Sequence, residues 1–170
     1  ARREKTLRLS KDDDKRRSLG AEMLLIKAAG RDDYVLSKNE KPYFPDNEVF
    51  FSLAHCGDYA VCAVSDVPVG VDIELPRAGG SSLAKRFFRH DEAALVYAAD
   101  DPDREFCRLW TLKESYIKCA DLRLGNIRSF SVVSGAEGCS FSCASHGEYL
   151  IGCCAKTQDI GEIIIINEKI

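Results

Sequence analysis

A nine-residue segment occurs twice in this chain, and the repeat limits the folds that the chain can adopt. Residues 51–59 read FSLAHCGDY and residues 141–149 read FSCASHGEY, so five of the nine positions are identical at an offset of 90. A sixth position exchanges Asp for Glu, and apolar residues follow both copies. Two copies are too few for a solenoid, which needs about three repeats to cover its faces. The repeat therefore predicts two similar halves related by a pseudo-twofold axis.

A helical segment repeats as well. Four residues recur at an offset of 91: Arg17, Ile26, Lys27 and Ala29 reappear as Arg108, Ile117, Lys118 and Ala120. Residues 12–29 carry apolar side chains at helical spacing and precede Gly30, which favours a helix end. The second copy begins after Asp101, has Pro102 at a favoured first position, and extends to about residue 120. Each half is expected to be a helix packed on a small antiparallel sheet, which is an α+β fold.

Alternating apolar residues between turn residues predict the strands of both halves. The strands are expected near residues 49–54, 59–65, 69–74, 130–133, 140–144, 149–155 and 162–166. Between the halves lie the Gly79-Gly80 pair and a short predicted helix over residues 91–99. The expected organisation is an N-terminal half over 1–77, a connecting segment over 78–100 and a C-terminal half over 101–170.

Composition and cysteine usage indicate a cytoplasmic protein. Hydrophobic residues make up 45% of the chain, enough for a core, and no apolar run approaches the ~20 residues that cross a bilayer. No charged-then-apolar signal segment opens the chain, so no membrane partner is expected. The eight cysteines lack CxxC pairs and the Cys/His spacing of a zinc site. This pattern favours buried free thiols in a reducing compartment over a disulfide framework.

The net charge of −3 includes a basic N-terminal segment. The first 17 residues hold eight basic and four acidic side chains, a local excess of +4 that leaves −7 for the remainder. Such a segment favours a small polyanionic ligand over a nucleic acid duplex, although a solvated helix start produces the same pattern.

Residues 69–74, VGVDIE, place two acids in a densely apolar strand. The period of two puts Asp72 and Glu74 on one face with Gly70, the two acids about 7 Å apart along the strand. Like charges at this spacing repel unless a cation lies between them or water surrounds them. A solvent-exposed edge strand is the common explanation of such a pattern, but Gly70 and the apolar flanking residues favour a covered strand.

The segment LWTLKESYIK, residues 109–118, carries the complementary charges. Glu114 and Lys118 are four residues apart, a spacing that also suits an exposed ion pair of about 0.2–0.5 kcal/mol. Trp110 and other apolar residues instead indicate a buried helix, so its Glu114, Lys113 and Lys118 are expected in the groove between the halves. Three acids with two lysines suit Mg²⁺, which binds a few carboxylates together with phosphate oxygens. No glycine-rich phosphate loop occurs in the chain.

These residues together resemble the 4′-phosphopantetheinyl transferases, in particular the larger pseudo-dimeric type that serves peptide and polyketide synthases and siderophore pathways. That type carries a (V/I)G(V/I)D(I/V)E motif followed by W(S/T)xKE(S/A)xxK, and this chain reads VGVDIE at 69–74 and WTLKESYIK at 110–118. KRFF at 85–88 and His55 at the end of an apolar strand add to the match. Ala54 departs from it, because relatives usually carry Ser there.

The resemblance implies transfer of 4′-phosphopantetheine from coenzyme A to a serine of an acyl or peptidyl carrier protein, with Mg²⁺ and with release of adenosine 3′,5′-bisphosphate. Asp72, Glu74 and Glu114 would bind the metal. Glu114 and Lys118 would be catalytic, Glu114 by helping to deprotonate the serine. Lys118 and Lys113 would stabilise charge on the diphosphate. The positions that match other contacts to coenzyme A are Arg16, Lys41 and His55.

Two other functions fit the same acids: a Mg²⁺-dependent phosphohydrolase or nucleotidyl transferase, and a non-catalytic module that binds coenzyme A or a carrier protein. Glu92, where relatives carry an acid, suits either the metal site or a helix cap. Without the resemblance, His55 would be a strand-end histidine, and Arg16 and Lys41 would be surface residues. The segment 76–88 is expected to dock the carrier through exposed apolar residues such as Leu83, and the fused halves predict a monomer.

Overall fold

Both copies of the repeated segment form the same β-hairpin in the computed structural model of this chain, which describes residues 12–136 and 138–160. The strands of the hairpins are β3 (Phe50–Cys56), β4 (Tyr59–Ser65), β6 (Ser140–His146) and β7 (Tyr149–Ala155). β3 pairs with β4, and β6 with β7, in registers that correspond at the offset of 90. Gly57 and Gly147 begin the two-residue turns with φ of 55° and 58°, a conformation that favours glycine.

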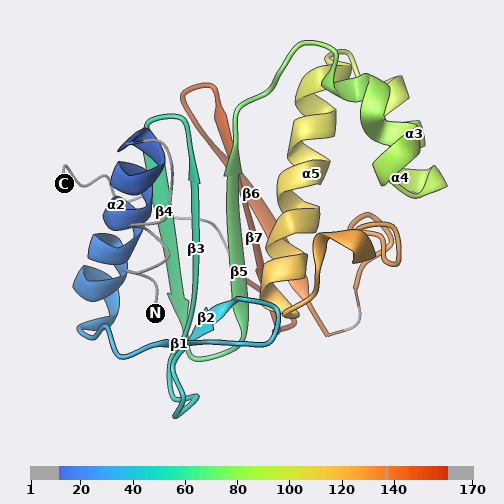
Figure 1. Cartoon of the computed structure of the whole chain (residues 1–170). Coiled ribbons are helices and arrows are strands. Elements are labelled where there is room, and N and C mark those ends of the chain that lie inside the picture. Colours follow the sequence, from blue (N-terminus) through green and yellow to red (C-terminus); the bar gives the residue numbers. More distant parts are fainter. Residues whose placement is uncertain (1–11, 137, 161–170) are drawn as a thin grey trace.

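A helix of 18 residues packs on each hairpin, as predicted. The helices are α2 (Asp12–Ala29) and α5 (Pro102–Cys119). The Asp101 carboxylate caps α5 by accepting a hydrogen bond from the Arg104 amide at 3.0 Å. Figure 1 shows α2 beside β3 and β4, and α5 beside β5 (Val69–Glu74) and β7. These elements confirm the α+β fold class, and the pseudo-twofold relation between the two copies stays a prediction.

Strand β5 does not pair within the small sheet of the first half, where the sequence placed residues 69–74. It pairs with β7 in a sheet of order β5-β7-β6, antiparallel throughout, whereas β3 and β4 form a separate two-stranded sheet. The expectation that residues 69–74 complete a sheet of the first half was therefore wrong. β5 still contacts the first hairpin, because Val71 and Ile73 pack against Ala54 of β3 in a buried cluster. This strand joins the two parts of the molecule.

Two glycines explain why β5 lies beside β7 under α5. A Cβ atom on Gly70 of β5 would lie 1.9 Å from the carbonyl oxygen of Ser115, and one on Gly152 of β7 would lie 2.7 Å from the carbonyl carbon of Thr111. The register pairs Asp72 with Gly152, so the two glycines are diagonal neighbours on one face of the sheet. The backbone of α5 therefore touches the backbone of both strands, and any larger side chain excludes that contact.

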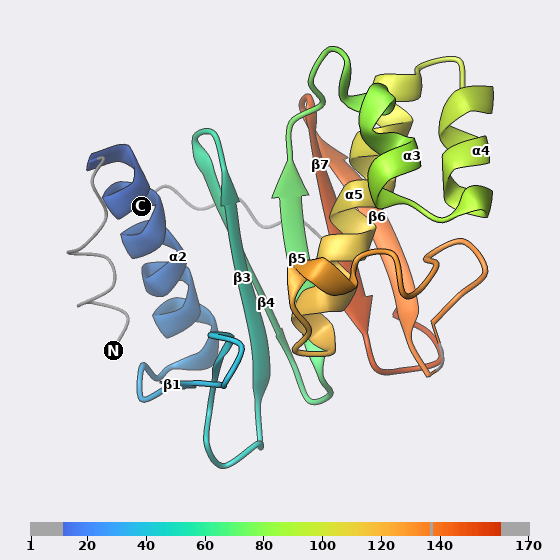
Figure 2. The ribbon, with the colours of Figure 1, turned by 45° about the vertical axis from the view of Figure 1, so that its right-hand side comes forward.

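The connecting segment lies against α5, as Figure 2 shows, and aromatic side chains form the contact. Its elements are η1 (Gly80–Leu83), α3 (Ala84–Phe87) and α4 (His90–Ala98). The Phe88 and Phe106 rings stack at 4.8 Å between centroids. Phe87 packs edge-on against Trp110 at 5.3 Å. The helix predicted over 91–99 is confirmed, whereas η1 and α3 were not predicted.

The strand predicted over residues 130–133 does not form, because backbone groups of this segment bond to side chains instead of to a neighbouring strand. The Phe130 carbonyl accepts from Lys113, and the Val132 amide donates to Glu92. The strand predicted over 162–166 lies outside the described residues. Three short elements were not predicted: β1 (Val35–Leu36), β2 (Pro42–Tyr43) and η2 (Leu124–Asn126).

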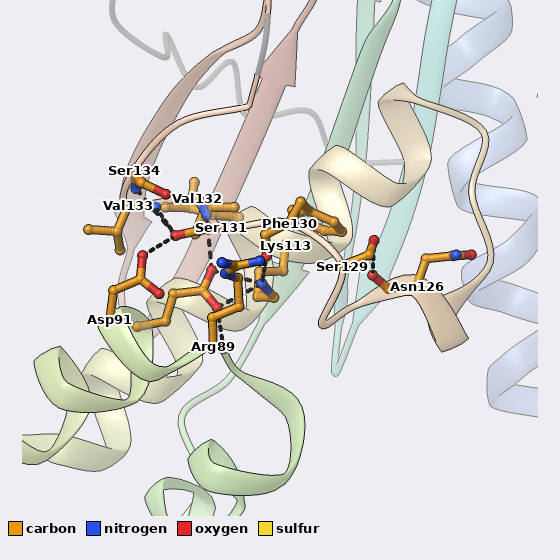
Figure 3. A network of polar contacts seen from close by, with 12 residues as sticks. Arg89, Asp91, Lys113, Asn126, Ser129, Phe130, Ser131, Val132, Val133 and Ser134 are labelled. Carbon is orange, nitrogen blue, oxygen red and sulfur yellow. Dashed lines mark hydrogen bonds and ion pairs between the residues drawn. The ribbon is translucent and has the colours of Figure 1, made fainter.

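A buried ion pair connects α4, α5 and the loop that precedes β6, and Figure 3 shows the surrounding contacts. Lys113 and Glu92 are fully buried, with Lys113 Nζ 2.7 and 2.8 Å from the two carboxylate oxygens. The carboxylate also accepts from the Arg89 and Val132 amides at 2.9 Å. Nζ donates its third hydrogen bond to the Phe130 carbonyl at 2.8 Å. Every charged atom is hydrogen-bonded, which offsets the cost of burying the pair.

Two further expectations concern the chain as a whole. All eight cysteines are free, as predicted, but only Cys107, Cys119 and Cys154 are buried and the other five are half-buried. Across residues 12–136 and 138–160, no helix combines the length and the apolar character that a membrane span requires.

Replacing Gly70 with Ala tests the close contact between α5 and β5. The added methyl group overlaps the Ser115 carbonyl, so we expect Gly70→Ala to lower the free energy of unfolding by at least about 1–3 kcal/mol, measured by urea denaturation. Gly125→Ala is the matched control, because a Cβ at that position has no atom within 4 Å. Equal stability of the two variants would contradict the described contact.

Replacing Lys113 with Met tests the buried ion pair. The variant leaves the Glu92 carboxylate buried without its cation, so we expect a loss of about 3–5 kcal/mol in the free energy of unfolding. Lys85→Met is the control, because Lys85 is exposed on α3 and its loss is expected to change stability by no more than about 0.5 kcal/mol. A Lys113→Met protein as stable as the wild type would mean that this pair does not support the fold.

Candidate functional site

The face of β5 that α5 covers carries the two acids of the VGVDIE motif. Asp72 is only 4% exposed, and Glu74, two residues later on the same face, is half-buried. The covered strand predicted from the sequence is therefore observed, and the solvent-exposed edge is ruled out. α5 contributes Glu114 and Lys118, one turn apart, to the same region.

Lys118 and Asp72 form the central contact of the site. Lys118 Nζ lies 2.7 Å from Asp72 Oδ1 and also donates to the Val71 carbonyl at 3.1 Å. The lysine side chain is 28% exposed, whereas the aspartate side chain is 6% exposed. The ammonium therefore lies between a buried carboxylate and solvent, where it can contact a second anion.

The other oxygen of Asp72 has no partner. Among the buried side-chain nitrogen and oxygen atoms of the described residues, Oδ2 of Asp72 is the one that lacks a hydrogen bond. Burying a carboxylate oxygen without a partner costs about 1–3 kcal/mol or more. An orphaned acceptor beside two more acids fits a cation that binds oxygen.

Mutual repulsion and burial raise the pKa values of the other two acids. Burial, followed by the negative charge of Asp72, raises the pKa of Glu114 to about 7, while Lys118 and a hydrogen bond from Trp110 oppose the shift. Burial and the charge of Asp72 also raise the pKa of Glu74 above its usual value. Both carboxylates thus hold a proton more tightly than exposed acids do, and a divalent cation in this region would relieve the repulsion.

The acids are neighbours but are not preassembled as a tight ligand set. The charge of Asp72 raises the pKa values of both glutamates, so the three acids are near one another. Their carboxylate oxygens nevertheless do not all lie within 4.8 Å of one another. Among the described His, Cys, Asp and Glu residues, one group of three meets that spacing, and it consists of cysteines. One ion held by Asp72, Glu74 and Glu114 together therefore requires side-chain rotation. The residues supply the oxygen donors that suit Mg²⁺, and the orphaned Asp72 oxygen fits that role.

The remaining predicted ligand contacts lie at different distances from this centre. His55, exposed at the end of β3, is close enough for its charge to lower the pKa of Asp72. Arg16 is exposed on α2, next to Arg17, whose guanidinium donates to the Gly57 carbonyl in the turn after His55. Lys41 precedes β2 in the chain, and its side chain reaches the start of β5, where Nζ lies 3.3 Å from the Val69 carbonyl oxygen.

Two predicted residues lie elsewhere. The prediction that Lys113 binds the diphosphate does not agree with the structure, because its ammonium is fully buried and uses its three hydrogen bonds on Glu92 and Phe130. For Glu92 the sequence allowed two roles, in the metal site or as a helix cap. In the structure it caps α4 by accepting a hydrogen bond from the Arg89 amide. Both residues belong to the buried network of hydrogen bonds in which Figure 3 labels Lys113, Arg89 and Phe130.

Sequence reasoning missed three contacts of the acids. The Trp110 side chain hydrogen-bonds to Glu114, and their spacing of four residues on a helix is a signal that pointed to this contact. The Cys56 thiol donates to Glu74 at 3.5 Å. Buried Cys107 has a pKa raised to about 12, first by burial and then by Glu74. No sequence pattern identified the two cysteines, because the approach of Cys56 to Glu74 and the influence of Glu74 on Cys107 depend on how the strands and α5 pack.

Comparisons with known proteins agree with this arrangement. The model of the 4′-phosphopantetheinyl transferase superfamily matches residues 68–160, more than half of the chain. A 4′-phosphopantetheinyl transferase of Bacillus subtilis is 37% identical over 144 residues, which cover 77% of this chain and 64% of the relative. The 4′-phosphopantetheinyl transferase Sfp of Bacillus subtilis strain 168 is 33% identical over 129 residues, covering 69% of this chain and 57% of Sfp.

A third relative, the 4′-phosphopantetheinyl transferase gsp of Aneurinibacillus migulanus, is 36% identical over 115 residues, or 62% of this chain and 48% of gsp. The chain thus spans about half to two thirds of the length of these curated relatives. The matched residues include β5 and α5, which carry the acids and Lys118. By this match, the chain belongs to the 4′-phosphopantetheinyl transferase superfamily.

Proposed function

We propose that this chain transfers 4′-phosphopantetheine from coenzyme A to a serine of an acyl or peptidyl carrier protein. The observation that carries the proposal is the buried Asp72 carboxylate, with Lys118 on one oxygen, no partner on the other, and Glu114 beside it. The family match and the relatives named 4′-phosphopantetheinyl transferase support the reaction type.

Mg²⁺ is the proposed cofactor, held by Asp72, Glu74 and Glu114. The donor set consists of hard carboxylate oxygens, and the orphaned Asp72 oxygen accounts for one ligand position. When bound, the ion would neutralise charge on the diphosphate of coenzyme A and polarise its oxygens. The half-buried positions of Glu74 and Glu114 leave room for water and substrate oxygens beside the protein ligands.

Glu114 is the proposed general base. In the reaction, the serine oxygen forms a bond to the phosphorus of the phosphopantetheine group, and the phosphoanhydride bond to adenosine 3′,5′-bisphosphate breaks. The serine proton moves to Glu114, directly or through water. A carboxylate whose pKa is raised to about 7 accepts a proton more readily than an exposed glutamate, and it remains ionised in part at neutral pH.

Lys118 is proposed to stabilise the leaving diphosphate. Its ammonium, partly exposed beside Asp72, can share its remaining donor with a phosphate oxygen as negative charge develops there. His55, close to Asp72, extends the positive charge toward the turn of the first hairpin, where Arg16 lies on the neighbouring helix. We propose His55 and Arg16 for the phosphates of coenzyme A. Lys41, whose ammonium donates to the Val69 and Cys119 carbonyl oxygens, is not part of this proposal.

The connecting segment is the proposed docking surface for the carrier. Leu83 in η1 is 41% exposed, and Leu95 and Tyr97 on α4 are also exposed. A monomer in the cytoplasm is the proposed setting, since β5 already joins both parts of one chain.

Glu114→Gln is the sharpest test of the proposed chemistry. The protein is incubated with coenzyme A, Mg²⁺ and an unmodified carrier domain, and the carrier is weighed by mass spectrometry. We expect the wild type to add phosphopantetheine, and Glu114→Gln to lose at least about 10²–10⁴-fold in rate while its thermal unfolding stays cooperative. Glu105→Gln is the matched control, because it makes the same change on the same helix at a residue paired with Arg108. It is expected to transfer phosphopantetheine at the wild-type rate.

The outcomes of that assay separate the three functions considered. Nucleotide release without a mass change of the carrier would indicate a hydrolase, and binding without either would indicate a non-catalytic module. Full activity of Glu114→Gln would remove Glu114 from the mechanism. Activity that survives a chelator would remove Mg²⁺ from it.

The raised pKa of Glu114 predicts how stability of the metal-free protein changes with pH. Between the ordinary value of 4.5 and about 7, the unfolded chain releases this proton while the folded protein keeps it. Folding is therefore disfavoured as pH rises through this window, and the loss is complete above it. Four residues act on the Glu114 carboxyl group: Asp72, Glu74, Lys118 and Trp110. Comparing the wild type with Glu114→Gln therefore isolates the titration of Glu114.

In a chelator, the stability of Glu114→Gln relative to the wild type is expected to increase by roughly 1–3 kcal/mol from the acid to the alkaline side of this window. Urea denaturation at each pH gives both values. A difference that does not change with pH would show that Glu114 titrates as an ordinary glutamate.

A further inference from the structure

Three cysteines from separate elements converge at the C-terminal end of α5, between one and two helical turns beyond Glu114. Cys119 ends α5, Cys154 lies on β7, and Cys139 lies just before β6. Their three sulfur atoms all lie within 4.8 Å of one another. Among the described His, Cys, Asp and Glu residues, this is the one group of three with that spacing. No sequence pattern predicted this group, because the three positions have no metal-binding spacing.

The cluster is distinct from the catalytic acids. Cys154 pairs with Gly70, two residues before Asp72, and Cys119 is five residues beyond Glu114, about 7.5 Å along the helix. The Cys119 thiol also contacts a residue before β5 rather than the acids, since it donates to the Pro68 carbonyl oxygen at 3.2 Å. None of the residues assigned to phosphate transfer in the site around Asp72 contributes a sulfur atom to this group.

Burial and charge around the cluster are those of a small metal site. Cys119 and Cys154 are 7% and 0% exposed, whereas Cys139 is half-buried, so the group is closed on the sheet side and reachable past Cys139. Lys41 Nζ lies 3.5 Å from the Cys119 carbonyl oxygen, and its charge acts on Cys119 and Cys154. A cation is therefore already in place to balance excess negative charge on the sulfurs.

We propose that Cys119, Cys139 and Cys154 bind one thiophilic divalent cation, with Zn²⁺ as the ion that suits the site. Zinc–sulfur bonds of about 2.3 Å in a tetrahedral site place sulfur atoms about 3.8 Å apart, so small rotations of the thiols bring them to that spacing. Three thiolates and one divalent ion carry a net charge of −1, which the Lys41 ammonium neutralises. Binding replaces three thiol protons, which pass to solvent, and water completes the fourth position on the Cys139 side.

The proposed site would be structural. It connects the end of α5, β7 and the loop before β6, a segment with little regular secondary structure between η2 and Ser140. Fixing that loop against the helix and the sheet is expected to raise stability by mass action, because the separated thiols of the unfolded chain bind the ion more weakly. This inference does not depend on the proposed transferase function.

Cadmium titration of the reduced, metal-free protein tests the proposal, since Cd²⁺ replaces Zn²⁺ and gives a sulfur-to-metal charge-transfer absorption that carboxylates do not produce. We expect saturation at one Cd²⁺ per chain, with an accompanying rise in melting temperature. Cys139→Ser is expected to weaken binding at least about 10-fold and to abolish the thermal shift. Cys154→Ser is expected to do the same, with cooperative thermal unfolding as the check that the variant is folded.

Two control variants define the result that overturns the site. Cys62→Ser, on β4, and Cys56→Ser, beside Glu74, are expected to titrate as the wild type does. Absence of a saturable charge-transfer band in the wild type would refute the site. Equal binding by Cys139→Ser and the wild type would also refute it, and this test remains valid because Cys139 is half-buried in a loop and outside the core clusters.

Discussion

The close contact between α5 and the β5–β7 pair is the constraint on which the rest of the structure depends. Gly70 and Gly152 allow the helix backbone to touch the sheet, so side chains near this contact are covered on both sides. The contact also explains the strand order, since it holds β5 beside β7, with which it pairs, and β5 does not pair with β4. It therefore buries Asp72, which lies between the two glycine contacts in register.

Burial of that carboxylate produces the electrostatics of the site. An exposed Asp72 would be screened by water and would affect its neighbours weakly. At 4% exposure it shifts the pKa values of Glu74 and Glu114 upward, and it retains Lys118 at 2.7 Å. Both the affinity for a cation and the basicity proposed for Glu114 thus follow from one packing contact between a helix and two strands.

The sequence predicted features that depend on local pattern. The period of two placed Asp72 and Glu74 on one face of a covered strand, and the repeat indicated a helix and a hairpin for each copy, all of which are observed. The pairing partner of β5 was wrong, because alternation specifies the faces of a strand and not its neighbour. The selection of β7 depends on Gly70 and Gly152 fitting under the same helix, a relation between positions 82 residues apart.

The same limit explains the error at residues 130–133 and at Lys113. Apolar and β-branched residues favoured a strand there, but Glu92 and Lys113, from two other elements, take up the Val132 amide and the Phe130 carbonyl. A strand needs those groups for its ladder. The cysteine cluster was missed for the same reason, since its three members approach one another only after α5, β7 and the loop before β6 have packed.

Two lysine–carboxylate pairs on α5 show how one helix separates a structural function from a chemical one. Lys113 and Lys118 are five residues apart, which rotates them by about 140° around the helix. The Lys113–Glu92 pair is fully buried and every polar atom is hydrogen-bonded, so it has no capacity for a ligand. The Lys118–Asp72 pair leaves one carboxylate oxygen without a partner and the ammonium partly exposed. Incomplete hydrogen bonding at a buried charge is costly for folding, and a site that must bind and release metal and phosphate requires such unfilled positions.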